Sequence, residues 1–499
     1  MGYVTLNAYD ADVRIPQFLG INQYGEEHGS NPCYASEMVN GYVKEGCLQP
    51  MAACMVQRAA TPAPMETLAL LHRRWYAPDE EHDILIAGAG GKLYWKYPDG
   101  ASWTELPFPE GVEGYQCNEW STVGYEINEG TSVLTAEDPI DVLLLSNAKD
   151  GMVCVRADNM TVTAVPTPKR FGVIERHAER IWGGAIEDDP DMLVYSAPYD
   201  PFNWEEDPTI PEDGAGDIQQ PGWDGDRFTA LKTFGTQLIA FKRTRVWRIL
   251  GTNPGEYTFY EQYGGGTAYE KTVAVNNTVI YMLGRNGLLA YNGETVSDYK
   301  QDYVGRIWER MNRDALDQAC GCMFGRTYYL ALPLDRSSVN NAVLMYDTAN
   351  GIFLLREGVS VERFLPTEDK LYFTSSQTPG KYWLWQEDVY NENQWAEPMK
   401  WVGPWMDFNY KSKTKGSFTL YVTVDCEDEK AIDFSIQTEK KTKTKTVTFS
   451  PAEYGKECKQ RRLSFGGTGR RFRLIIEANG GERWRIAGGI GLTVETDDD

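Results

Sequence analysis

Two acidic clusters of this 499-residue chain have residue types that could bind a metal ion. They are residues 187–191 (EDDPD) and 213–217 (DGAGD). Carboxylates near small residues suit calcium, which takes oxygen ligands. Neither cluster has the spacing or the closing glutamate of a helix–loop–helix calcium site, so a solvated turn is the favoured interpretation of both.

Signatures of catalysis are scarce. The four histidines, at positions 28, 72, 82 and 177, include no pair four residues apart, and the Cys-Gly-Cys at 320–322 lacks the usual spacing of zinc or redox sites. No nucleophile elbow, phosphate loop or zinc-protease motif occurs. We therefore expect no catalytic residues, no metal site and no cofactor. Carboxylates for glycoside hydrolysis stay an alternative, because a sequence cannot place two of them the ~5–10 Å apart that this reaction needs.

The most distinctive stretch is aromatic, residues 196–207 (SAPYDPFNWEED). Asp200-Pro201 is a turn signal, and its proline fixes one backbone angle. Trp204 is predicted to anchor this loop onto a sheet, with Tyr199 beside it. A sugar-binding aromatic is the alternative role.

The elements that position these residues follow a repeat. A short apolar run, a polar turn and a second apolar or aromatic run occur seven times, with starts 38 to 58 residues apart. This interval is typical of one four-stranded sheet per repeat. The sequence predicts an all-β protein with a β-propeller over residues 64–395, of about seven blades, six or eight being possible. The copies start at positions 83, 141, 179, 236, 277, 326 and 369.

Two further segments flank the propeller. Residues 396–499 contain six strands with alternating apolar and polar positions, which predicts a β-sandwich. Its lysine-rich stretch, within residues 411–445, is predicted to form an edge. Residues 1–63 show no repeat, and we expect them to form an arm along the blades or a neighbouring subunit. The arm and the lysine-rich stretch are candidate subunit contacts, with plain solvated surface as the alternative for the latter.

Composition narrows the function further. The net charge is −23, from 72 acidic and 49 basic residues, which disfavours a nucleic-acid reader. The nine cysteines are too few and too irregular for a secreted disulfide framework. We expect reduced thiols, no signal peptide and no membrane-spanning segment.

Three segments resemble one family. Residues 175–207 carry an apolar strand, a polar turn and a Tyr-Ser, Asp-Pro-x-x-Trp stretch, and they resemble a segment of tailed-bacteriophage tail hub or nozzle proteins (tail tube protein B-like). Residues 15–51 resemble the opening pattern of this family. Residues 466–495 resemble its closing strands, where a turn with Gly469 and Arg470 leads to strands around Trp484.

The resemblance implies a structural virion protein of the tail or neck, made in the cytoplasm of a bacterial host. It implies a homo-oligomeric ring, such as a hexamer, around the DNA channel below the portal or adaptor. DNA would pass through the lumen without specific binding. No catalytic residue comes with the resemblance. A glycan-binding or glycan-cleaving propeller and a receptor-binding tail-tip protein are the alternatives.

Overall fold

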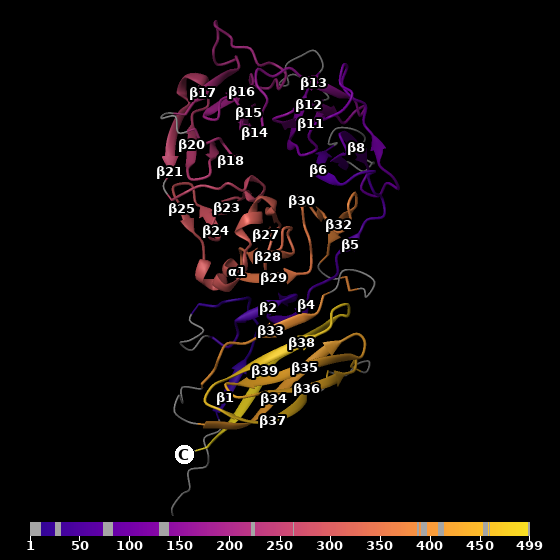
Figure 1. The fold of residues 1–499 in the computed structure, drawn as a ribbon, viewed down its shortest axis with the longest axis vertical. Coiled ribbons are helices and arrows are strands. Elements are labelled where there is room, and N and C mark those ends of the chain that lie inside the picture. The colour runs from indigo at the N-terminus through magenta and orange to yellow at the C-terminus, as the bar shows by residue number, and fades with distance from the viewer. Residues whose placement is uncertain are drawn as a thin grey trace, which may run out of the picture.

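The computed structural model divides into a ring of small sheets and a two-sheet domain below it (Figure 1). It describes residues 11–24, 31–72, 83–128, 139–220, 225–262, 264–386, 389–390, 397–407, 414–452, 458 and 460–497. Among these residues the structure is almost entirely β-sheet, as predicted.

Seven four-stranded antiparallel sheets form the propeller within the described ranges, so the blade number is seven. Blade 1 contains β6 (Met65–His72), β7 (Asp83–Ala89), β8 (Lys92–Lys96) and β9 (Thr104–Glu105). Blade 2 contains β10 (Ser121–Ile127), β11 (Ile140–Asn147), β12 (Gly151–Arg156) and β13 (Val162–Val165). Blade 3 contains β14 (Val173–His177), β15 (Arg180–Gly184), β16 (Met192–Tyr195) and β17 (Gly216–Gln219). Blade 4 contains β18 (Ala230–Phe234), β19 (Gln237–Phe241), β20 (Val246–Leu250) and β21 (Thr258–Gln262). Blade 5 contains β22 (Ala274–Asn276), β23 (Val279–Leu283), β24 (Leu288–Tyr291) and β25 (Val296–Asp298). Blade 6 contains β26 (Cys320–Phe324), β27 (Thr327–Leu332), β28 (Ala342–Asp347) and β29 (Ile352–Glu357).

Each predicted repeat is the central hairpin of one blade. Central strands are buried on both faces, between neighbouring blades, and therefore appear in the sequence as short continuous apolar runs. The turn at 285–287 joins β23 to β24, and Gly284 donates its N–H to the carbonyl of Gly287 (2.8 Å). Gly287 has φ +151°, which favours glycine at this turn.

Blade 7 is assembled from both ends of the propeller sequence. It contains β30 (Arg363–Pro366), β31 (Leu371–Thr374), β32 (Tyr382–Trp385) and, as its outer strand, β5 (Met55–Val56). In this register Trp383 is opposite Val56 and Leu384 opposite Met55. Hydrogen bonding between segments more than 300 residues apart thus closes the ring.

The second domain has two sheets, as predicted for residues 396–499. One has the order β3 (Gly41–Lys44), β4 (Cys47–Pro50), β39 (Trp484–Asp497), β34 (Thr414–Cys426), β37 (Arg461–Gly469), and β39 also pairs with β1 (Ala11–Ile15). The other has the order β2 (Glu37–Val39), β33 (Met399–Val402), β38 (Phe472–Ala478), β35 (Lys430–Thr438), β36 (Thr442–Phe449). The lysine-rich strand β36 is an edge, as expected, although residues 411–413 of the wider stretch 411–445 lie outside the described ones.

The described part of residues 1–63 does not form a separate arm. Strands β1 to β4 belong to the second domain and β5 to blade 7. The physical reason is burial: Ile15, Phe18 and Leu48 are fully buried there. The segment also runs along blade 6, because Ile21 and Asn40 donate their N–H groups to the carbonyls of Phe353 (2.8 Å) and Leu355 (2.9 Å).

Helices are short. Residues 301–318 form η4 (Gln301–Val304), α1 (Gly305–Arg310) and η5 (Arg313–Gln318), with Ile307 and Trp308 buried. Two other 3-10 turns are η2 (Pro254–Glu256) and η3 (Glu270–Thr272). In the part of the chain that the structure describes, no helix is long and apolar enough to span a bilayer.

Candidate functional site

The predicted aromatic loop lies directly after β16. Trp204 donates its Nε1–H to the carbonyl of Pro201 (2.9 Å), and its ring centroid is 5.2 Å from that of Phe171. Phe202 donates its N–H to Oδ1 of Asp200 (2.9 Å), so Asp200-Pro201 does start a turn. Pro201 is buried and Trp204 half-buried. Trp204 therefore packs as an anchor of the loop.

Tyr199 differs from these residues, because 37% of it is exposed. Its φ of +60° turns the chain sharply, and its N–H bonds to the carbonyl of Glu179 (2.8 Å). This backbone holds the ring at the surface, where a partner could contact it.

Arg180 fixes the long acidic insertion behind this loop. It is only 2% exposed, and its guanidinium donates to the carbonyls of Ser196 (2.7 Å), Gly214 (2.6 Å) and Glu212. Its guanidinium carbon also lies 5.3 Å from the ring centroid of Tyr195. These hydrogen bonds to carbonyl oxygens offset the free-energy cost of burying the positive charge of Arg180.

The acidic clusters behave differently from each other. Asp191 is fully buried and pairs with the equally buried Lys242, so the solvated turn predicted for this residue is wrong. The Nζ of Lys242 is 4.9 Å from the ring centroid of Phe228, which packs over this ion pair. Asp217 lies in β17 and is exposed. The described residues contain no group of three or more His, Cys, Asp or Glu placed to hold a metal ion.

The turn at Gly469 and Arg470 is held by a glutamate of the neighbouring hairpin. Glu439 accepts the N–H groups of Arg470 (3.1 Å) and Arg471 (2.7 Å). A side chain at position 469 would begin 2.7 Å from Cβ of Thr438, so only glycine fits this close approach. The sequence pattern thus marks a strand connection against the β35–β36 hairpin.

Trp484 starts β39 opposite Cys426 and is 1% exposed. It belongs to a core cluster that extends from the second domain into blades 5, 6 and 7. Its surroundings make it a packing residue, and it cannot contact a partner without rearrangement.

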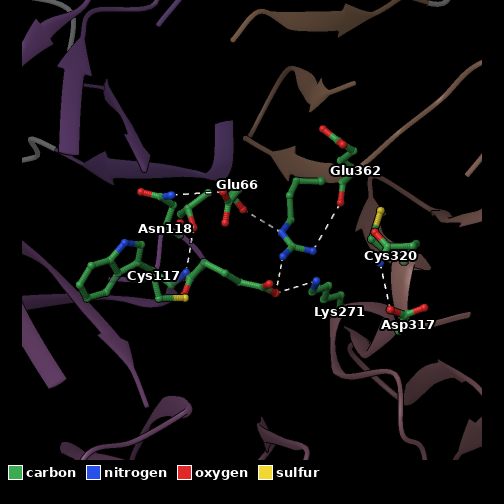
Figure 2. Close-up of polar contacts among 12 residues, drawn as sticks. Glu66, Cys117, Asn118, Lys271, Asp317, Cys320 and Glu362 are labelled. Atoms are coloured by element: carbon green, nitrogen blue, oxygen red, sulfur yellow. Dashed lines mark hydrogen bonds and ion pairs between the residues drawn. The ribbon is translucent and has the colours of Figure 1, made fainter. Parts of the chain in front are cut away.

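A polar cluster that no local sequence pattern predicts lies where the inner strands of the propeller begin (Figure 2). Glu119, just before β10 in blade 2, forms ion pairs with Lys271 of blade 5 (2.6 Å) and Arg363 of blade 7. Blades 2 and 5 stand three positions apart in a ring of seven, so the first contact crosses the propeller axis.

Backbone and amide groups complete this axial cluster. Arg363 also donates to the carbonyls of Glu66 (3.2 Å) and Glu362 (3.4 Å), and Asn118 donates to the Glu66 carboxylate (3.1 Å). Figure 2 shows Glu66, Lys271 and Glu362, which come from three different blades, around this cluster. Glu119 and Arg363 are 244 residues apart, so no local sequence pattern could have linked them.

The carboxyl groups of the axial cluster differ in pKa. Burial raises the pKa of Glu270 and of Glu362, and the nearby charge of Glu119 adds to the effect on Glu270. Burial alone would also raise the pKa of Glu119, but Arg363 and Lys271 together outweigh it and the pKa is lowered. The cluster therefore contains one firmly ionised carboxylate beside two that take up protons readily. It can connect blades, and it offers carboxyl groups for acid–base chemistry.

Comparisons with known proteins do not assign the chain to a family. No protein-family model matches the chain, and no curated protein does. Among solved structures it is similar to the Pan2 WD40 domain of Neurospora crassa, with a TM-score of 0.36 and 10% identity over 68% of this chain and 97% of that one. It is also similar to PorZ, a surface component of the type IX secretion system of Porphyromonas gingivalis, with a TM-score of 0.35 and 8% identity over 86% of this chain and 52% of that one.

Proposed function

We propose that this chain is a structural subunit of a bacteriophage tail hub or nozzle, assembled as a ring around the channel through which DNA leaves. One observation carries the proposal most directly. Two of the three segments that resemble such proteins, 15–51 and 466–495, are partners in one sheet. Ile15 is opposite Ile490 and Leu48 opposite Ile486. The two segments that carry the resemblance thus lie side by side in one sheet of the second domain.

The connection between the two domains supports a role in which the subunit transmits mechanical force. The backbone hydrogen bonds from Ile21 and Asn40 to blade 6 join the second domain to the propeller. Glu357 at the end of β29 also donates its N–H to Oδ1 of Asn40 (2.9 Å). Phe18, Phe353 and Trp401 belong to one continuous core. A subunit joined in this way transmits force without a hinge at that junction.

The axial cluster bears on where DNA would pass in this proposal. Ion pairs of Glu119 with Lys271 and Arg363 cross the middle of the propeller. DNA in this proposal therefore runs through the ring of subunits, and not through the propeller of one subunit. The net charge of −23 suits a lumen wall along which DNA slides without adhering. The portal or adaptor and other tail proteins would be its neighbours in the virion.

A glycan-cleaving propeller is the second candidate. The axial carboxyl groups favour it, since the pKa is raised at Glu270 and Glu362 and lowered at Glu119. Glycoside hydrolysis uses such a pair of one protonated and one ionised carboxyl group.

Native mass spectrometry of the purified full chain, combined with an assay of sugar release from bacterial cell-wall glycans, separates the two. The tail-ring proposal predicts a closed multiple of the 56.4 kDa subunit and no sugar release. A monomer whose sugar release is lost in Glu270→Gln and kept in the exposed-site variant Glu105→Gln would contradict it.

A further inference from the structure

The second domain carries opposite charges at the two ends of its strands. At one end, the β35–β36 hairpin and the neighbouring turn bear six exposed cations, Lys440, Lys441, Lys443, Lys445, Arg470 and Arg471. The one acid of the hairpin between positions 438 and 446, Glu439, is already bound to two backbone N–H groups. We call this surface the basic hairpin.

The other end is acidic. The turn between β34 and β35 exposes Glu427, Asp428 and Glu429. Beside it lies a groove of about 540 Å³ on the outer face of the sheet that contains β35 and β38. A second hollow of about 400 Å³ shares Ala431 and Asn479 with this groove. We call the two together the acidic groove, and the acids that line it are Glu37, Glu357, Glu429, Asp433, Glu477 and Glu482.

Three of these six acids already have cations. Glu37 pairs with Lys400 (2.7 Å), Glu357 with Arg310 (2.7 Å) and Glu482 with Lys430 (2.6 Å). Asp433 and Glu477 lie directly opposite each other on β35 and β38 and form no ion pair with a described residue, although Lys400 lies opposite Glu477 on β33. Like charges in this position repel.

The accessible member of this pair is Glu477, whose side chain is exposed, whereas Oδ1 of Asp433 is buried and receives no hydrogen bond from the described residues. An ammonium group that enters the groove can reach the carboxylate of Glu477 and offset its repulsion with Asp433.

We propose that the basic hairpin of one copy docks in the acidic groove of the next copy. The tip of the basic hairpin, at Lys440 and Lys441, lies beyond Thr438, and Asp433 of the acidic groove lies five residues back along β35, roughly 17 Å away. The two surfaces cannot meet within one molecule. A contact between different surfaces of identical subunits is head-to-tail, and it closes a ring when the rotation allows.

The orientation of the strands agrees with a ring. The strands of the second domain run obliquely across the long axis of the molecule (Figure 1). Copies that contact each other through the ends of these strands therefore stand beside one another with their propellers on the same side. This inference rests on the proposed ring and names the contact that builds it.

Charge reversal on each side tests the contact. Lys440→Glu with Lys441→Glu reverses the basic hairpin, and Glu429→Lys with Glu477→Lys reverses the acidic groove; all four side chains are exposed. We expect each pair to raise the concentration of half-assembly about tenfold or more in analytical ultracentrifugation, with unchanged circular dichroism. Lys440→Arg with Lys441→Arg is the matched control and assembles like the wild type.

The chain with all four reversals restores attraction, so it should assemble again. Assembly of the wild type together with unaltered assembly of both reversal pairs would overturn the docking inference and leave the ring standing. Failure of the fourfold variant to recover, while each pair alone disrupts assembly, would also overturn it. A wild type that stays monomeric at every concentration would refute the ring itself and this contact with it.

Discussion

Glu119 is the residue on which most of the ionic contacts at the propeller axis depend. Its carboxylate faces two cations from distant blades, Lys271 and Arg363, whose side chains are 23% and 19% exposed. Loss of the carboxylate leaves both cations beside each other without a counter-charge. Because water reaches part of the cluster, the cost is smaller than for a fully buried pair.

Glu119→Gln should therefore lower the free energy of unfolding by about 1–2 kcal/mol, measured by urea titration. The matched control is Glu105→Gln, which removes an exposed partner of Lys92 (2.8 Å) and should leave the free energy of unfolding unchanged. Equal effects of the two substitutions would show that the cross-axis contacts do not hold the blades together.

The raised pKa of Glu270 gives a pH dependence with a definite sign. In the folded chain its pKa lies above the ordinary value of 4.5, so the folded state binds the proton more tightly than the unfolded state. Its contribution to the free energy of unfolding rises as the pH falls from 7 toward 4.5. Glu119 has a lowered pKa, and its contribution is lost only below this range.

The difference in free energy of unfolding between wild type and Glu270→Gln isolates this term from groups such as His177, whose lowered pKa acts in the opposite direction. We expect the variant to be relatively more stable at pH 7 and this advantage to shrink as the pH falls toward 4.5. A difference that stays constant across this range would contradict the assignment.

At the level of single elements, the insertion after the aromatic loop depends on Arg180 of β15. Arg180→Met removes three donors from carbonyls that are otherwise buried, and it should cost about 2–4 kcal/mol in free energy of unfolding. A Glu-specific protease should then cut faster at Glu205, Glu206 and Glu212. Arg176→Met is the control, since Arg176 lies on the adjacent strand in a surface pair with Glu179 and should cost less than about 1 kcal/mol. Similar cleavage rates in both variants would contradict the role of Arg180.

The elements also show what the sequence alone could predict. The blade hairpins were found because their central strands are apolar on both faces, and the six strands after residue 413 because one of their faces is buried. Strands β1 to β5 were missed, since they are two to five residues long and complete sheets made by residues far along the chain. The axial cluster was missed because its residues lie far apart along the chain, with Glu119 and Arg363 separated by 244 residues. Trp204 was interpreted as a packing anchor from local turn chemistry, and it packs as one.

For the molecule as a whole, the N-terminal segment joins the parts. A chain that begins at Met65 lacks the outer strand of blade 7 and four strands of the second domain. It exposes core positions that Phe18, Met38 and Leu48 cover. We expect it to aggregate and to lose its cooperative thermal transition in differential scanning calorimetry. A soluble, cooperatively melting truncated chain would contradict the joining role.

The ring is the central claim at this scale, and electron-microscope images of the purified full chain test it most directly. Two-dimensional class averages should show closed rings with an open lumen, with the propellers on one side and the two-sheet domains in contact between neighbours. Single particles of one propeller and one two-sheet domain at every protein concentration would contradict it.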